Sequence, residues 1–171
     1  TKVLAAADVV VVSAAHEAAK VAAMTGQEAA VVGLPVEPVP CGPRPDWADR
    51  PTLGVLGFVY PGKGHADVVR VAACLPERPR VVAAGAVSPG HESVRAKLEN
   101  LAATLRVELV LTGRLDDAAM GAAAHAVTVP VVPGRAVSAS GTLATWWAAG
   151  RRPLVAAGVY ATEQARAFPD A

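Results

Sequence analysis

The chain has 171 residues, a length that fits one domain of ordinary size, and 53% of its residues are hydrophobic while 18% are charged. This apolar share is ample for a packed core and excludes wholesale disorder. The formal net charge of +1 gives no basis for a nucleic-acid partner. Alanine, glycine, proline and valine are abundant, a composition typical of a GC-rich bacterial genome.

The cysteines and the hydropathy exclude further classes of protein. Cys41 and Cys74 are the only cysteines, and no CxxC or Cys/His cluster occurs, so we expect neither a disulfide framework nor a zinc site. No apolar run is long enough to span a membrane and no signal peptide is present, which predicts a cytoplasmic protein. The opening segment 1–13 lacks a methionine and reads like the middle of a longer chain.

The first third of the sequence divides into a short structured segment and a linker. Residues 8–13 (DVVVVS) predict a buried strand, residues 14–25 a helix with Ser13 as its N-cap, and residues 30–33 another strand. Six prolines then fall between residues 35 and 51. This crowding predicts an extended linker, because proline interrupts both helices and central strands.

From residue 52 onward, short apolar runs alternate with helical patterns. The predicted strands are 52–58, 80–84, 108–112, 126–131 and 153–156, and the predicted helices are 65–75, 94–105, 116–124, 141–149 and 162–167. This alternation predicts an α/β fold, a Rossmann-like parallel sheet with helices on both faces. In such sheets ligands bind beyond the carboxyl ends of the strands, so the loops that follow the strands are the candidate site.

The loop after the first of these strands has the character of an anion-binding turn. Its sequence GFVYPGKG nearly matches a P-loop, but Gly64 stands where a P-loop has the Ser or Thr that holds Mg²⁺. Gly62, Lys63 and Gly64 would still offer N–H groups and a positive charge to an anion. The alternative is a tight turn with an exposed lysine, and this loop alone does not decide between the two.

A second such loop precedes the helix predicted at 141–149. Its residues Ser138, Ser140, Gly141 and Thr142 are small or polar, and the free N–H groups of a helix N-terminus favour an anion. Gly141 also lets a phosphate approach the backbone closely. The alternative is simple N-capping by Ser138 or Ser140, but capping needs only one such residue. Two such loops on one sheet predict a diphosphate held between them.

The positions of the histidines and of two neighbouring tryptophans are also predicted from the sequence. Each of the four histidines is expected at the surface or in a cap, and only His65, beside Lys63, is a candidate contact for phosphate. Trp146 and Trp147 point about 100° apart on one helix, so one is expected in the core and the other toward a partner domain.

Taken in order, these segments resemble the C-terminal, donor-binding domain of retaining glycosyltransferases with the GT-B fold, of the large family-4 type. The resemblance runs from about Asp8 to the end of the chain. It rests on the ordered segments ADVVVVS, AVVGLPVEPVP, LGFVYPGKGHADVVRVA, VVAAGA, LVLTGRLDDAAMGAAAHA and ASGTLATWWAAGRRPLVA.

The resemblance implies a nucleotide-sugar donor as partner, bound without metal or cofactor. It implies that the diphosphate contacts Lys63 and the backbone of residues 138–142, that the nucleobase lies against Gly113, Arg114 and Leu115, and that Gly85 lies on the sugar side. It divides the chain into 1–34, the last strand and helix of an acceptor-binding N-terminal domain, a linker at 35–51, and the donor domain at 52–171. Such a piece would bind a donor but would not turn over alone.

Three positions depart from the pattern of that family. Phe58 stands where an arginine is common, and Val137 and Thr145 stand where the family has two glutamates, one for the sugar and one for the ribose. Because of these changes, the resemblance does not identify which nucleotide-sugar is the donor. They also keep two alternatives open, a non-catalytic nucleotide-binding or interaction domain on the same scaffold and a sugar-nucleotide epimerase of the same fold.

Overall fold

Five parallel strands form the main sheet of the computed structural model, which describes residues 2–35, 37–135 and 137–169. The strand order is β5-β4-β3-β6-β7, so the predicted parallel α/β sheet is confirmed. The predicted segments 1–34, 35–51 and 52–171 each include residues outside the described ones. The strands are β3 (Thr52–Leu56), β4 (Arg80–Ala84), β5 (Leu109–Leu111), β6 (Val129–Val132) and β7 (Leu154–Val155).

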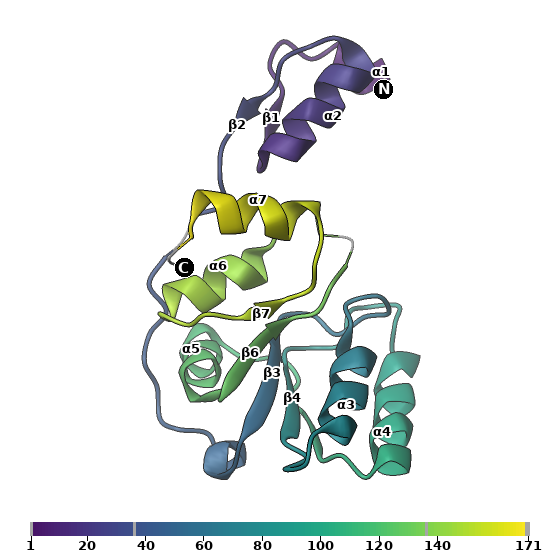
Figure 1. Ribbon diagram of the computed structural model, residues 1–171, viewed down its shortest axis with the longest axis vertical. Helices are drawn as coiled ribbons and strands as arrows, with labels where there is room; N and C mark the ends of the chain where they lie inside the picture. The colour runs from purple at the N-terminus through teal and green to yellow at the C-terminus, as the bar shows by residue number, and fades with distance from the viewer. Residues whose placement is uncertain (1, 36, 136, 170–171) are drawn as a thin grey trace.

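Helices cover both faces of this sheet (Figure 1). The chain runs from β3 through β4 to β5 and then returns to β6 on the other side of β3, so its right-handed crossovers change face once, at that return. One face carries the first two helices and the other carries the next two. The helices are α3 (His65–Cys74), α4 (Ser93–Leu105), α5 (Asp117–Ala126) and α6 (Gly141–Ala148).

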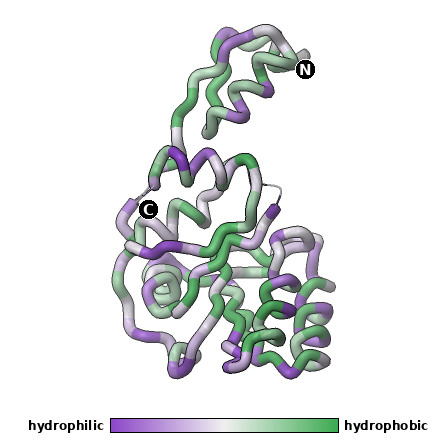
Figure 2. The backbone as a smooth tube through the Cα atoms, in the orientation of Figure 1, coloured by the Kyte–Doolittle hydropathy of each residue, from purple (hydrophilic) through white to green (hydrophobic). Residues whose placement is uncertain are grey.

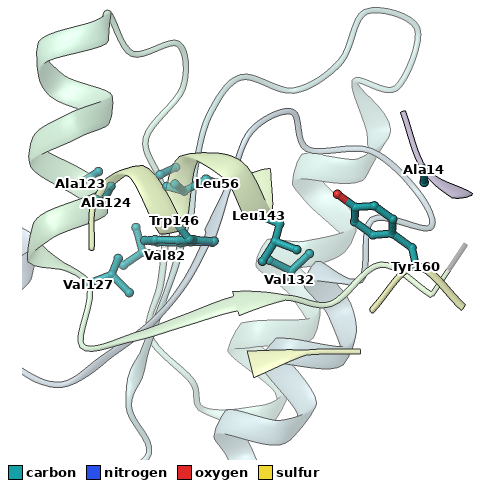
Figure 3. Packing of buried hydrophobic residues seen from close by; sticks show 12 residues of the cluster. Ala14, Leu56, Val82, Ala123, Ala124, Val127, Val132, Leu143, Trp146 and Tyr160 are labelled. Carbon is teal, nitrogen blue, oxygen red and sulfur yellow. The ribbon is translucent and has the colours of Figure 1, made fainter. Parts of the chain in front are cut away.

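Each face of the sheet has its own apolar core, because successive side chains of a strand point to opposite faces. Leu56 and Val82 pack with Trp146 of α6 in one cluster, which Figure 3 shows, whereas Val55 and Val81 pack with residues of α3 and α4 in another. All five residues of β3 are buried. Trp146 is fully buried and Trp147 packs on Phe168 at an edge-on angle of 60°, so the prediction of one core tryptophan is correct.

A small N-terminal unit stands apart from the main sheet at the top of Figure 1. It consists of α1 (Lys2–Ala5), β1 (Val11–Val12), α2 (Ala15–Thr25) and β2 (Ala30–Val31), and its two strands pair in parallel with each other. It touches the rest of the chain where α2 packs on the last helix, α7 (Val159–Ala167).

Two predictions about this unit are wrong. The strand predicted to be buried is exposed, with Val9 73% and Val11 58% exposed, because a sheet of only two strands leaves its faces uncovered. Figure 2 shows the hydrophobic colour along these strands. Ser13 is not the N-cap of α2, since Ala14 occupies that position; instead, the Ser13 N–H donates to Glu17 at 3.0 Å.

Residues 37–45 of the proline-rich segment lie in neither a helix nor a strand, but the segment is not free of helix. A 3₁₀ helix, η1, occupies Asp46–Asp49. Arg80 holds it in place by hydrogen bonds to the Trp47 carbonyl and to Asp49, while it also pairs with Glu108 at 2.6 Å. The linker residues that precede η1 pack on α5, where Gly121 allows the Pro40 carbonyl to approach the helix backbone.

The exposed N-terminal unit should exchange its amide protons faster than the main sheet. The amides of residues 10–32 that pair β1 with β2 should be less protected than those of β3, because local opening requires less free energy where few apolar contacts cover a strand. Hydrogen exchange followed by mass spectrometry would measure this. Equal protection would show that another surface, in this chain or a second one, covers the unit.

A second prediction tests the packing of the linker on α5. Gly121→Ala should lower the free energy of unfolding by about 1–3 kcal/mol, because the added Cβ would lie 2.0 Å from the Pro40 carbonyl oxygen. Helix propensity alone would give the opposite sign, a gain of about 1 kcal/mol. Denaturant unfolding measures the change, and Gly141→Ala is the matched control, since no atom lies within 4 Å of its added Cβ.

Candidate functional site

The carboxyl edge of the main sheet carries the two loops that the sequence singles out. β3 and β6 are neighbours, so the loop after β3 lies beside the loop after β6. Gly64, with φ 97°, is packed on Pro133, and a Cβ there would lie 2.7 Å from the proline ring. The structure thus brings the two predicted anion-binding loops together.

One hydrogen bond links these loops directly. The Lys63 ammonium donates to Thr142 Oγ1 at 3.1 Å. Gly57, with φ 90°, leaves room beside them, because a Cβ built there would lie 3.5 Å from Thr142 Oγ1 and 3.9 Å from Lys63 Nζ. Lys63 is therefore not the exposed lysine of a tight turn, and its side chain points to the N-terminus of α6.

Two helix N-termini meet at this point. In α6 the Ser140 hydroxyl accepts from the Leu143 N–H at 3.1 Å, so Ser140 is the N-cap. Within the described part of the chain, no acceptor takes the N–H of Gly141 or Thr142. At the start of α3, Gly64 is the N-cap and no side chain caps the helix. Free N–H groups and an ammonium thus face the same region.

Partial burial makes the ammonium of Lys63 easier to deprotonate. Desolvation lowers the pKa of this ammonium below its ordinary value of 10.5. None of the ion pairs among the described residues includes Lys63, so a hydroxyl is its hydrogen-bond partner rather than a carboxylate. A half-buried cation without a counter-ion gains most from an anionic ligand.

Ser138, the first residue of the second loop, contacts the N-terminal unit. Its hydroxyl donates to the Glu17 carboxylate of α2. The second oxygen of this carboxylate accepts from the Ser13 N–H at 3.0 Å. This contact joins positions 121 residues apart, and no signal in the sequence points to it.

The remaining predicted site residues lie on the neighbouring loops. Gly113, with φ 73°, and exposed Arg114 follow β5, while Leu115 packs on the core beneath α5 and α6. Gly85 follows β4 and donates its N–H to Thr112 Oγ1 at 3.0 Å; a Cβ on Gly85 would lie 2.2 Å from the Gly57 carbonyl oxygen. Their roles toward a nucleobase or a sugar stay predictions.

A cavity of about 570 Å³ opens beside the N-terminus of α6. Gly141 and Thr145 line it from α6, Asp117 and Met120 from α5, and Glu37 from the linker. Thr145, where a glutamate would match the resembled family, faces this cavity and donates its hydroxyl to the Gly141 carbonyl at 2.9 Å. The cavity falls within the size range of small-molecule sites.

His65, at the start of α3, is buried rather than exposed. It is 3% exposed, and neither ring nitrogen has a partner among the described residues. Burial, followed by the charge of Lys63, lowers the pKa of His65 from 6.5 to about 4. The expectation that this histidine lies at the surface or in a cap is thus wrong on exposure, while its contact with phosphate stays a prediction.

The described residues contain no group of three or more His, Cys, Asp and Glu placed to hold a metal ion. None of their helices has both the length and the apolar composition needed to cross a membrane. The expectation that the site works without a metal stays a prediction.

Comparison with solved structures identifies the architecture. HepE from Anabaena in complex with UDP-glucose superposes with a TM-score of 0.75 and 14% identity over 92% of this chain and 47% of that chain. Sucrose-phosphate synthase from Thermosynechococcus elongatus superposes with a TM-score of 0.69 and 19% identity over 92% of this chain and 42% of that one. The chain has the fold of a GT-B glycosyltransferase half.

This GT-B likeness is structural. Neither the models of protein families nor the curated proteins give a match to the sequence. A complex of GtfA and GtfB is a more distant structural neighbour, with a TM-score of 0.57 and 13% identity over 88% of this chain. The chain spans about half the length of the first solved structures that it matches, 42% and 47%.

The buried histidine gives the site a measurable pH dependence. Between pH 6.5 and about 4 the unfolded chain binds a proton at His65 and the folded chain does not, so the free energy of unfolding falls as the pH falls. The loss should be on the order of 3 kcal/mol in full. Urea unfolding across this range measures it, and His65→Phe should remove this part of the slope.

His91→Phe serves as the matched control for that experiment, because His91 is exposed on the loop before α4. It should keep the slope of the unaltered chain. An unchanged slope in His65→Phe would show that His65 is protonated in the folded state.

Proposed function

We propose that this chain is the donor-binding half of a nucleotide-sugar-dependent glycosyltransferase, which holds the diphosphate of a sugar nucleotide between the loops after β3 and β6. The observation that carries the proposal is the Lys63–Thr142 hydrogen bond, which places an uncompensated ammonium at the free N–H groups of α6. An anion that reached this point would meet a positive charge and backbone donors together.

The structural neighbours support this class of ligand. HepE has been solved in complex with UDP-glucose, with UDP and glucose, and with UDP. In our proposal, the cavity of about 570 Å³ beside α6 takes the nucleoside, near the loop of residues 113–115, and Gly85 lies on the sugar side. Residues 1–34 then belong to the acceptor-binding half and residues 35–51 join the two halves.

The same groups explain how the site would favour glycosyl transfer. When the bond between the sugar and the diphosphate breaks, negative charge grows on the leaving diphosphate. Lys63 and the N–H groups of Gly141 and Thr142 are already in place to stabilise that charge, so little reorganisation is needed at the moment of reaction. This chemistry needs no metal ion.

A non-catalytic nucleotide-binding domain on the same scaffold is the second candidate. It is favoured by Val137 and Thr145, which replace both glutamates of the resembled family. Both candidates predict nucleotide binding. They differ in whether the full protein transfers a sugar.

Nucleotide binding is the first test. Isothermal titration calorimetry with UDP, GDP, ADP and uridine should show at least one diphosphate binding better than uridine, because the site is built for the diphosphate. Lys63→Ala should then weaken that binding about tenfold to a hundredfold, the range expected for loss of a charge-assisted contact.

Lys97→Ala is the matched control for the lysine, because Lys97 is exposed on α4 and belongs to neither loop. It should leave the affinity unchanged. Equal affinities of Lys63→Ala and the unaltered chain, with both folded, would reject the donor site, and so would the failure of all four ligands to bind.

A further inference from the structure

The contact between the N-terminal unit and the second loop brings a carboxylate to the proposed donor site. Glu17 lies in the first turn of α2, and its carboxylate accepts the Ser138 hydroxyl, three residues before α6 begins. No acidic residue lies in the first turn of α6. Glu17 therefore supplies, from a distant part of the chain, an acidic group that the loop itself lacks.

The position of Glu17 is held on two sides. Glu163 of α7 accepts the N–H groups of Ala15 at 2.7 Å and of His16 at 3.1 Å, and it pairs with the His16 ring at 2.9 Å. Ala14 is buried in the core cluster that includes Tyr160. The start of α2 is therefore docked on α7, and the Glu17 carboxylate is presented by an anchored helix turn rather than by a mobile arm.

The charge of Glu17 limits which groups of a sugar nucleotide can form a hydrogen bond with it. The hydrogen bond from Ser138 lowers the pKa of this carboxyl below its ordinary value of 4.5, so it is ionised at neutral pH. Two anions repel at short range, which excludes the diphosphate as its direct partner. Each carboxylate oxygen accepts one protein donor and retains capacity for another, and hydroxyl groups are the donors of the ligand that fit.

The nucleoside and the sugar both carry hydroxyls, but they lie at opposite ends of the diphosphate. The cavity proposed for the nucleoside is lined by α5, the outer face of α6 and the linker, and Glu17 is not part of its wall. With the diphosphate at the N-terminus of α6, the end of the ligand beyond this cavity is the sugar. We infer that Glu17 accepts hydrogen bonds from hydroxyls of the transferred sugar, an inference that rests on the proposed function.

The test compares each nucleoside diphosphate with its sugar conjugate. Calorimetry with the pairs UDP and UDP-glucose, GDP and GDP-mannose, and ADP and ADP-glucose gives the gain in affinity that the sugar adds. In Glu17→Gln this gain should fall about fivefold to tenfold for the pair that binds, because a neutral amide oxygen replaces a charged acceptor. The affinity for the diphosphate alone should stay the same or rise.

Two more variants keep the result interpretable. Ser138→Ala releases the carboxylate from the loop without changing α2, and it should reduce the gain from the sugar in the same direction. Glu28→Gln removes one exposed negative charge from the same N-terminal unit, and it should leave the gain unchanged.

The outcomes separate this inference from the proposed function. If a diphosphate binds but its sugar conjugate binds no better to the unaltered chain, the inference fails while the donor site stands. If Glu17→Gln changes the affinity for both members of a pair by the same factor, Glu17 acts through charge or docking alone and the inference is wrong. If none of the six ligands binds, the proposed function fails as well.

Discussion

The site depends on one topological constraint, the central position of β3 between β4 and β6. The chain leaves β3 in one direction to build β4 and β5, then returns to build β6 and β7 on the other side. The loops after β3 and β6 therefore leave neighbouring strands toward opposite faces, and a crevice opens between them at the carboxyl edge. Lys63 and Thr142 meet across that crevice because the loops that carry them follow neighbouring strands.

Close packing of small residues makes this arrangement possible. Gly54 of β3 lies against Val127, where an added Cβ would come within 2.4 Å of a valine methyl. Gly57 and Gly85 approach each other in the same way beyond the strand ends. A chain rich in alanine, glycine and valine can bring backbones together to a degree that larger side chains would prevent. The composition of the sequence is thus reflected in the geometry of the site.

The buried strands could be read from the sequence because β3 and β4 are continuous apolar runs between turn residues. The loops after β3 and β6 were singled out by their glycines and small polar residues, and their binding of an anion stays a prediction. The burial of β1 was mispredicted because an apolar run indicates only that a strand could be covered. The contacts of Glu17 and the burial of His65 depend on chain packing, which local pattern does not encode.

The hydrogen bonds between Glu163 and the start of α2 have a consequence for the order of folding. Their partners are 148 and 147 residues apart in the chain, whereas the strand pairs β3–β4 and β4–β5 join residues within about 30 positions of each other. Closing a long loop costs more chain entropy than closing a short one, so the local pairs can form earlier. The N-terminal unit is synthesised before the main sheet, yet its anchor is made only when α7 emerges. It is therefore the first part of this chain to be translated and the last to be fixed in place.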